Sequence, residues 1–177
     1  MEVTSDILLK GTAWNTAITR LSSVFSTRTN YSLFMLCLAI GIMYDQRIDS
    51  PSEQGEEPKF VPRNVIVNND NGQLDFFFQA AILSTTTEPI TEERKLDLAF
   101  GDDKERVGSK AKEDFSKIAF LTSFANFGVT KLVELIGNTD LESMENIKNF
   151  MISSAEGRNF EIDDLPTDII SPMDDYM

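Results

Sequence analysis

Few residues of this chain are of the types that carry out catalysis or hold metals. Its 177 residues include no histidine and a single cysteine, Cys37. Histidine is the commonest general base and nitrogen ligand in proteins, so its absence removes most hydrolase and metalloenzyme designs. Cys37 lies in an apolar run without a basic neighbour, which favours a buried inert thiol over a nucleophile. The residue types therefore favour a binding or assembly protein rather than an enzyme.

Carboxylates are the remaining candidates for chemistry. Adjacent pairs occur at Asp102-Asp103 and at Asp163-Asp164. Both pairs lack the alternating ligand spacing and the closing glutamate of a calcium loop, and no pair stands in a context typical of acid–base catalysis. The sequence also contains no phosphate loop of the Gly-x-x-x-x-Gly-Lys-Ser/Thr type and no Gly-x-Gly-x-x-Gly motif after a strand. We expect no catalytic residue, no metal site and no cofactor.

One group of basic residues is a candidate nucleic-acid patch. It consists of Lys104, Arg106, Lys110, Lys112 and Lys117. Acidic residues are interleaved with this group, and the whole chain has a formal net charge of -13 and a pI near 4.3. Such a chain is repelled by DNA at long range, so a solvated helix face is the favoured interpretation. Direct DNA binding through the group is retained as a hypothesis.

The C-terminal residues 158–177 combine acidic with regularly spaced apolar side chains. This acidic tail is too polar and too short to form a core of its own. One interpretation is that the tail only improves solubility. The other is that it lies in a groove, on this subunit or a neighbour, through the candidate partner-binding residues Phe160, Ile162, Leu165, Ile169 and Ile170.

The spacing of apolar residues predicts a mainly α fold. We expect one compact helical domain over residues 1–157, with at most a short β element near residues 3–9. Thr12 is expected to cap a first helix, and the apolar run Tyr31–Tyr44 to form a second. This run is shorter than the ~20 residues of a membrane-spanning helix, so it predicts a helix buried within the protein.

The middle of the chain alternates loops with apolar segments. Residues 49–62 have the composition of a surface loop, and Phe60–Val67 is β-prone. Leu74–Leu83 favours a helix, since its leucine, phenylalanine and isoleucine side chains share one face. The variable segment 84–112 is expected to hold one short helix between connections.

Two further helices are predicted in the last third of the domain. Ser109 is a candidate cap for a helix that Gly128 would interrupt and Gly137 would end. Thr139-Asp-Leu-Glu142 has the form of a capping box, which predicts a last helix closed by Gly157. Its predicted apolar face contains Leu141, Met144, Ile147 and Met151.

The order of these segments resembles a known family. The features that carry the resemblance are a helix, the turn Arg28-Thr-Asn30, an apolar helix ending near Gly41, Phe60-Val-Pro-Arg63, the block Leu74–Leu83 and Phe124-Ala-Asn-Phe-Gly-Val-Thr-Lys-Leu132. This arrangement, over about residues 7–136, is similar to the small DndE-like subunit of bacterial DNA phosphorothioation (sulfur-modification) systems. The resemblance implies a compact, mainly helical, non-enzymatic subunit that binds DNA as an oligomer.

The chain departs from that family in charge and in length. Lysine-rich surfaces are associated with DNA binding in the family, whereas this chain is acidic and adds residues 85–112 and the acidic tail. We therefore expect a non-catalytic accessory or assembly subunit of a bacterial DNA-modification or anti-phage defence complex, whose main partner is a larger protein subunit. Homo-oligomerisation is compatible with this interpretation, and DNA contact is disfavoured by charge.

Two further expectations concern location and an alternative function. The first residues carry no basic region ahead of an apolar stretch, and one cysteine allows no internal disulfide, so we expect a cytoplasmic protein without membrane contact. The alternative function is an acidic DNA mimic that inhibits a nucleic-acid-binding enzyme, which the net charge of -13 motivates.

Overall fold

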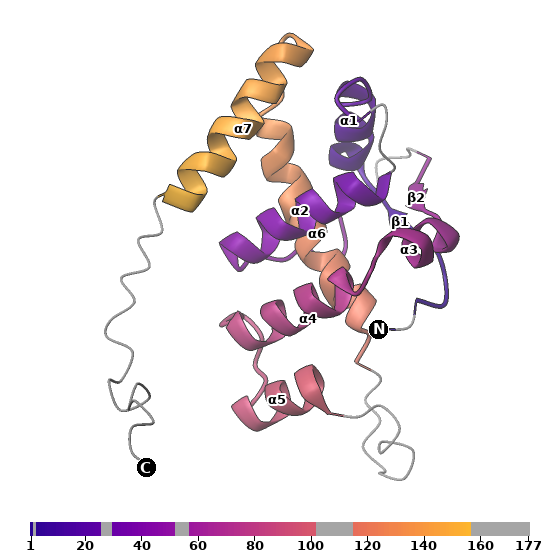
Figure 1. Cartoon of the computed structure of the whole chain (residues 1–177), viewed down its shortest axis with the longest axis vertical. Helices are drawn as coiled ribbons and strands as arrows, with labels where there is room; N and C mark the ends of the chain where they lie inside the picture. The colour runs from indigo at the N-terminus through magenta and orange to yellow at the C-terminus, as the bar shows by residue number, and fades with distance from the viewer. Residues whose placement is uncertain (2, 26–29, 52–56, 102–114, 157–177) are drawn as a thin grey trace, which may run out of the picture.

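The mainly helical fold predicted from the apolar spacing is confirmed by a computed structural model of the chain. The structure describes residues 1, 3–25, 30–51, 57–101 and 115–156. Within these ranges seven helices accompany one two-stranded sheet (Figure 1). The elements are β1 (Ile7–Leu9), α1 (Thr12–Arg20), α2 (Asn30–Tyr44), β2 (Lys59–Val61), α3 (Arg63–Asn69), α4 (Gln73–Ser84), α5 (Glu92–Phe100), α6 (Lys117–Glu134) and α7 (Asp140–Glu156).

The two strands form a short antiparallel pair at one side of the helices. Ile7 lies opposite Val61, and both are buried, whereas Leu8 between the inward positions is exposed. The predicted β character continues only to Val61, because α3 begins at Arg63. The Arg63 amide donates to Oδ1 of Asp6 at 2.7 Å, which satisfies one of the free N–H groups of the new helix. This tertiary contact outweighs the β propensity of the valines and isoleucine that follow.

Helices α2 and α6 cross at the centre of the fold. Both contribute fully buried side chains to the core, including Phe34 and Leu38 from α2 and Leu121 and Phe124 from α6. The prediction that Gly128 interrupts this part of the chain is wrong, since α6 runs unbroken from Lys117 to Glu134. A side chain at position 128 would collide with the carbonyl of Cys37. The glycine therefore allows α2 and α6 to cross closely and does not break the helix.

The starts of α1 and α6 differ slightly from prediction. Gly11, with φ 96°, takes the N-cap position of α1, so Thr12 is the first helical residue instead of the cap. Helix α6 is capped by Ser116, whose hydroxyl accepts from the Ala119 amide at 3.2 Å. The cap predicted at Ser109 lies outside the described residues.

A buried hydrogen bond between two side chains links helix α1 to α6. Trp14 Nε1 donates to Oδ1 of Asn126 at 2.9 Å, and Nδ2 of Asn126 donates to the Ile48 carbonyl at 3.0 Å. The Asn126 amide therefore joins α1, α6 and the segment after α2. At the other end of α1, the Arg20 guanidinium donates to the Gly137 carbonyl at 2.9 Å, beside the turn that leads to α7.

Helix α4 confirms the helix predicted at Leu74–Leu83, and its start is tied to α2. The Tyr31 hydroxyl donates to Oδ1 of Asp70 at 2.8 Å, and the same oxygen accepts the Leu74 amide at 2.8 Å. Burial, reinforced by this hydrogen bond to Asp70, raises the pKa of the Tyr31 hydroxyl above its usual range. The short helix expected in segment 84–112 is α5, which packs against α4.

Helix α7 folds back beside the end of α6 through a tight polar turn. The Glu142 amide donates to Oγ1 of Thr139 at 3.1 Å, which confirms one half of the predicted capping box. The Glu142 carboxylate, however, accepts from the Asn138 amide at 2.7 Å, one residue before the expected position. Nδ2 of Asn146 also donates to the Leu135 carbonyl at 3.1 Å. The predicted terminator Gly157 lies outside the described residues, as does the acidic tail.

Candidate functional site

Most residues proposed from the sequence as binding residues lie outside the described part of the chain. This holds for Phe160, Ile162, Leu165, Ile169 and Ile170 of the acidic tail and for Lys104, Arg106, Lys110 and Lys112 of the candidate nucleic-acid patch. The remaining member, Lys117, is the first residue of α6. Its ammonium lies 5.1 Å from the centre of the Phe78 ring of α4, a cation–π contact. Lys117 thus contributes to the packing between α4 and α6.

Cys37 has the properties of a core residue. Its side chain is fully buried in the interface of α2 with α6, and burial raises the pKa of its thiol above the usual range. A protonated, inaccessible thiol is a poor nucleophile and a poor metal ligand. Within the described ranges, no three Asp, Glu or Cys side chains are grouped in a way that would hold a metal ion.

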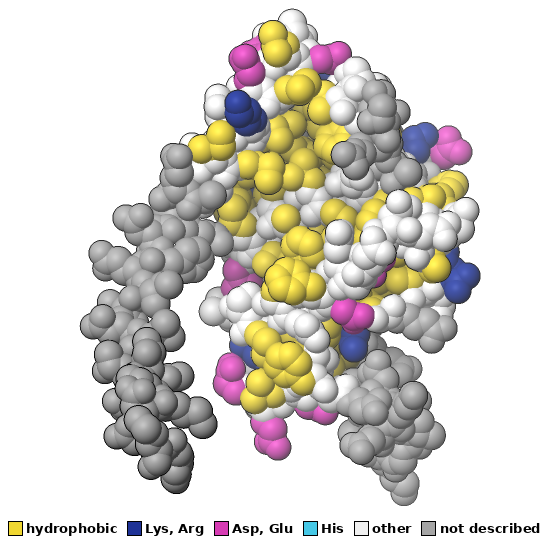
Figure 2. Space-filling model, viewed as in Figure 1, with side chains coloured by type: hydrophobic (Ala, Val, Ile, Leu, Met, Phe, Trp, Pro, Cys, Tyr) yellow, Lys and Arg dark blue, Asp and Glu magenta, His cyan; other side chains and the backbone are white. Residues whose placement is uncertain are grey.

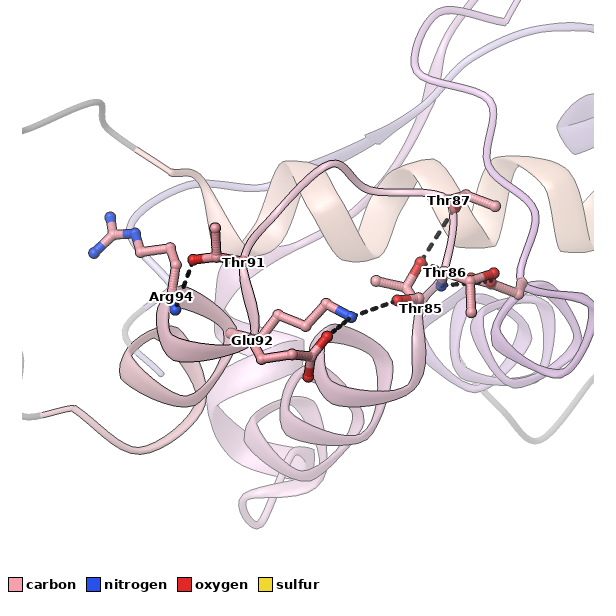
Figure 3. Close-up of polar contacts among 8 residues, drawn as sticks. Thr85, Thr86, Thr87, Thr91, Glu92 and Arg94 are labelled. Carbon is pink, nitrogen blue, oxygen red and sulfur yellow. Dashed lines mark hydrogen bonds and ion pairs between the residues drawn. The ribbon is translucent and has the colours of Figure 1, made fainter.

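A polar junction connects the ends of α2, α4 and α5 (Figure 3). Asp45 follows α2 in a left-handed conformation with φ 49°, and its carboxylate accepts from the hydroxyl of Thr85 at 2.6 Å and from the amide and hydroxyl of Thr86 at 2.8 Å each. The ammonium of Lys95, a buried residue of α5, donates to the Thr85 carbonyl at 2.8 Å and pairs with Glu92 at 3.0 Å. These contacts hold three helix ends together.

Arg47 extends this junction towards α6. Its guanidinium pairs with Glu88 and lies 5.3 and 5.7 Å from the ring centres of Phe120 and Phe124. Stacking on aromatic faces and pairing with a carboxylate are the usual structural roles of a half-buried arginine. Nε of Arg47 is nevertheless buried without a hydrogen-bond partner. The carboxylates and ammonium of the junction are all paired, and their contacts hold the helices together.

Helix α7 carries the clearest candidate for a binding surface. Four large apolar side chains along it are exposed, and we call them the α7 stripe: Leu141 (66% exposed), Met144 (51%), Met151 (50%) and Ile152 (43%). Figure 2 shows hydrophobic side chains gathered over α7 and over the surface between α7 and α1. A row of exposed apolar residues on one helix is unusual for a solvated surface and typical of an interaction site.

The inward face of α7 differs from the predicted one. Ser143 is buried, and Ile147 and Phe150 are half-buried against the core. Leu141, Met144 and Met151, which were predicted to share the core face with Ile147, instead point into solvent. The number of apolar residues in the sequence could have indicated that some of them are exposed. Phe150 and Ile152 bring the four predicted positions to six, which is more than one face of a peripheral helix can bury.

Lys148 interrupts the α7 stripe at its middle. It lies four residues after Met144 and four before Ile152, a spacing that places it on the same side of the helix. Its side chain is exposed, and no acidic group among the described residues pairs with it. Glu145, also exposed, lies four residues after Leu141 and so borders the same side. The stripe is therefore an apolar surface with one positive and one negative charge beside it.

Negative charge is distributed unevenly along the chain. The described residues contain 15 acidic and 10 basic side chains, which gives a net charge of -5. Residues 158–177 contain six acidic side chains and one basic, which also gives -5 in only twenty residues. The candidate nucleic-acid patch is neutral overall, since residues 102–117 contain five basic and five acidic side chains.

Comparison with known proteins returned no relative: no family model, no curated protein and no solved structure matches this chain. Among the helices of the described residues, none combines the length and the apolar character needed to cross a bilayer.

Proposed function

We propose that this protein is a non-catalytic accessory or assembly subunit of a bacterial DNA-modification or anti-phage defence complex. It acts in the cytoplasm by docking the α7 stripe onto a larger protein subunit. The class of complex is supported by the resemblance to the small phosphorothioation subunit. The docking mode is supported by one observation, the row of exposed apolar side chains at Leu141, Met144, Met151 and Ile152.

The chemistry of the α7 stripe fits a protein partner. Burial of a half-exposed aliphatic side chain contributes roughly 1 kcal/mol, so four of them supply several kcal/mol of binding free energy. Two of the four are methionines, whose unbranched side chains adapt to the shape of a partner. A few such residues can carry most of the energy of an interface.

Direct DNA binding has less support from the described residues. Five basic side chains there already pair with acidic ones, in the pairs Arg47–Glu88, Lys59–Glu57, Arg94–Asp97, Lys95–Glu92 and Lys131–Glu134. Binding to DNA gains free energy when free lysines and arginines replace counterions along the phosphates. Half of the ten basic side chains among the described residues therefore gain little from this exchange.

The alternative, an acidic DNA mimic that occupies a basic channel of an enzyme, is favoured by the net charge of -13. The distribution of charge weakens it, because the described residues account for only -5 of that total. If the protein is a mimic, partner binding weakens steeply with salt and DNA competes for the same site. Docking through an apolar stripe predicts weak salt dependence.

The test combines light scattering with partner capture. We expect the purified protein to migrate without duplex DNA at low and at physiological salt in size-exclusion chromatography. Capture of the larger subunit from the native cell should be lost when Met144→Glu and Met151→Glu are combined. Asn149→Glu introduces the same acid at an exposed position off the stripe and should leave capture unchanged. Co-migration with DNA at physiological salt, or undiminished capture by the double variant, would contradict the proposal.

A further inference from the structure

We infer that Met144 and Met151 are oxidation sites of the α7 stripe, at which hydrogen peroxide turns the stripe from an apolar into a more polar surface and so prevents docking. The effect on docking rests on the proposed function. The oxidation itself and the change of the surface stand on the structure of α7. Because methionine sulfoxide reductases restore the thioether, the stripe has a reduced state that docks and an oxidised state that does not.

Met144 and Met151 are the most exposed methionines among the described residues. Their side chains are 51% and 50% exposed. Met35 and Met43 of α2 are half-buried, and Met35 packs against the core. A peroxide must reach the sulfur atom to react with it, so exposure decides which methionine is oxidised first. Of the described methionines, the two in the stripe therefore react first.

The one cysteine of the chain does not compete for the oxidant. Thiolates react with peroxides more readily than thioethers do, so an accessible low-pKa cysteine would be modified before any methionine. Cys37 is fully buried, and burial raises the pKa of its thiol, which keeps the thiol protonated. Among the described residues, the stripe methionines are thus the accessible sulfur atoms that a peroxide can oxidise.

The reaction needs no group of the protein beyond the thioether. The sulfur lone pair of Met144 or Met151 attacks one oxygen of hydrogen peroxide, and the O–O bond breaks as the S–O bond forms. The other oxygen leaves as hydroxide and takes up the proton of the transferred hydroxyl group, which gives water. Sulfur loses two electrons and the peroxide gains them. The product is a sulfoxide, which is polar, whereas the thioether is apolar.

The positions of the two methionines make their oxidation effective. Met144 and Met151 lie seven residues apart, which is two turns and about 10 Å along one side of the helix. They supply two of the four apolar side chains of the stripe. A sulfoxide oxygen that is buried against an apolar partner, without a hydrogen-bond donor, weakens binding about tenfold for each group. Oxidation of both methionines therefore removes most of the affinity that the stripe provides.

Peptide mass spectrometry of the folded full chain, after brief treatment with dilute hydrogen peroxide, tests the two sites. We expect Met144 and Met151 to gain one oxygen atom roughly tenfold faster than Met35 and Met43, because their sulfur atoms are more accessible. In urea, where all four are equally exposed, this difference should disappear. Oxidation of Met35 or Met43 at the rate of the stripe methionines in the folded protein would overturn the inference.

Retention on a phenyl column tests the change of surface without any partner. The leucine variant combines Met144→Leu with Met151→Leu, which keeps the stripe apolar but removes its thioethers, and the matched control combines Met35→Leu with Met43→Leu. After peroxide treatment we expect the wild type and the control to elute earlier, and the reductases for both sulfoxide epimers to restore their retention.

The leucine variant should shift less than the other two proteins. The remaining methionines of the chain are common to all three, so a difference in retention reports the stripe. An equal shift of all three proteins would contradict the inference, because the change of surface would then come from methionines outside the stripe.

Partner capture separates this inference from the proposed function. If both are right, peroxide lowers capture of the larger subunit by the wild type and leaves capture by the leucine variant unchanged. If the combined Met144→Glu and Met151→Glu variant loses the partner while the oxidised wild type keeps it, docking stands and the inference is wrong. If the glutamate variant keeps the partner, the proposed docking is wrong, and mass spectrometry with the phenyl column still decides whether α7 carries the oxidation sites.

Discussion

Gly41 of α2 and Gly128 of α6 meet where the two central helices cross. A Cβ on Gly128 would collide with the carbonyl of Cys37 and lie 3.0 Å from the amide nitrogen of Gly41. A Cβ on Gly41 would collide with the carbonyl of Phe124. The backbones therefore approach more closely than any residue with a side chain allows at these two positions, and this approach sets the distance between the helices.

Replacing Gly128 by alanine should destabilise the protein. In an ordinary helix interior the change from glycine to alanine is favourable by about 1 kcal/mol, so a loss of stability reports the collision directly. We expect Gly128→Ala to lower the free energy of unfolding by about 2–3 kcal/mol, because the added methyl group must push two backbones apart. Urea unfolding followed by Trp14 fluorescence measures this change.

The control for this measurement is Gly72→Ala. Gly72 has φ 82° and open space where a methyl group would lie, so the substitution adds only backbone strain of about 1 kcal/mol. Gly41→Ala should behave like Gly128→Ala. A stabilising effect at position 128 would show that the helices are farther apart than described.

Asn126 should be intolerant of truncation. Its side chain satisfies the buried Trp14 indole N–H and the Ile48 carbonyl at once. Asn126→Ala leaves both groups without a partner, and we expect it to lower the free energy of unfolding by about 2–4 kcal/mol. Asn149→Ala, at an exposed position of α7, should change stability by less than about 0.5 kcal/mol. A small effect at Asn126 would mean that water replaces the amide.

The helices of the core could be predicted because their apolar patterns are continuous. Tyr31–Tyr44 and Leu74–Leu83 contain almost no polar residue that would favour a different structure, and both form the helices expected. Thr139 with Glu142 signals a helix start through local chemistry alone, and α7 begins at Asp140. Signals contained within about ten residues were sufficient in these cases.

Features that depend on distant residues could not be predicted. Gly128 looks like a helix breaker, and only the backbone of α2 beside it explains why it lies inside a helix. Val65–Val67 looks like a strand, yet Asp6 supplies a partner for the first amide of α3. The α7 stripe could not be predicted either. A peripheral helix does not bury every apolar residue that it carries, and the rest of the fold decides which ones are buried.

The stability contributed by Asp45 should depend on pH. Partial burial raises the pKa of its carboxyl, but hydrogen bonds from Thr85 and Thr86 and the charge of Arg47 outweigh burial, so the pKa is lower than its usual value of 3.8. Because the folded pKa is the lower one, the stabilisation is complete above the unfolded pKa and is lost as pH falls through the folded pKa. The relevant window therefore lies below about pH 5.

Asp45→Asn isolates this charge, since asparagine also tolerates the left-handed backbone found at position 45. We expect the wild type to be more stable than Asp45→Asn at neutral pH, and the difference should shrink as pH falls below about 5. Urea unfolding at several pH values measures the difference. Asp49→Asn, at an exposed carboxylate, serves as the control. A difference independent of pH would contradict the role assigned to the Asp45 charge.

Two neighbouring residues of α7 should separate stability from binding. Phe150 is half-buried against the core, whereas Met151 belongs to the exposed stripe. Phe150→Ala should lower the free energy of unfolding by about 1–2 kcal/mol, because it removes packing between α7 and the body. Met151→Glu should change it by less than about 0.5 kcal/mol, yet reduce affinity for the larger subunit at least about tenfold, because a carboxylate would be buried in the interface. Urea unfolding and a binding titration on the same two proteins measure both quantities.

Loss of stability in Met151→Glu would show that this side chain packs within the fold, and the stripe would then not be a free surface for docking.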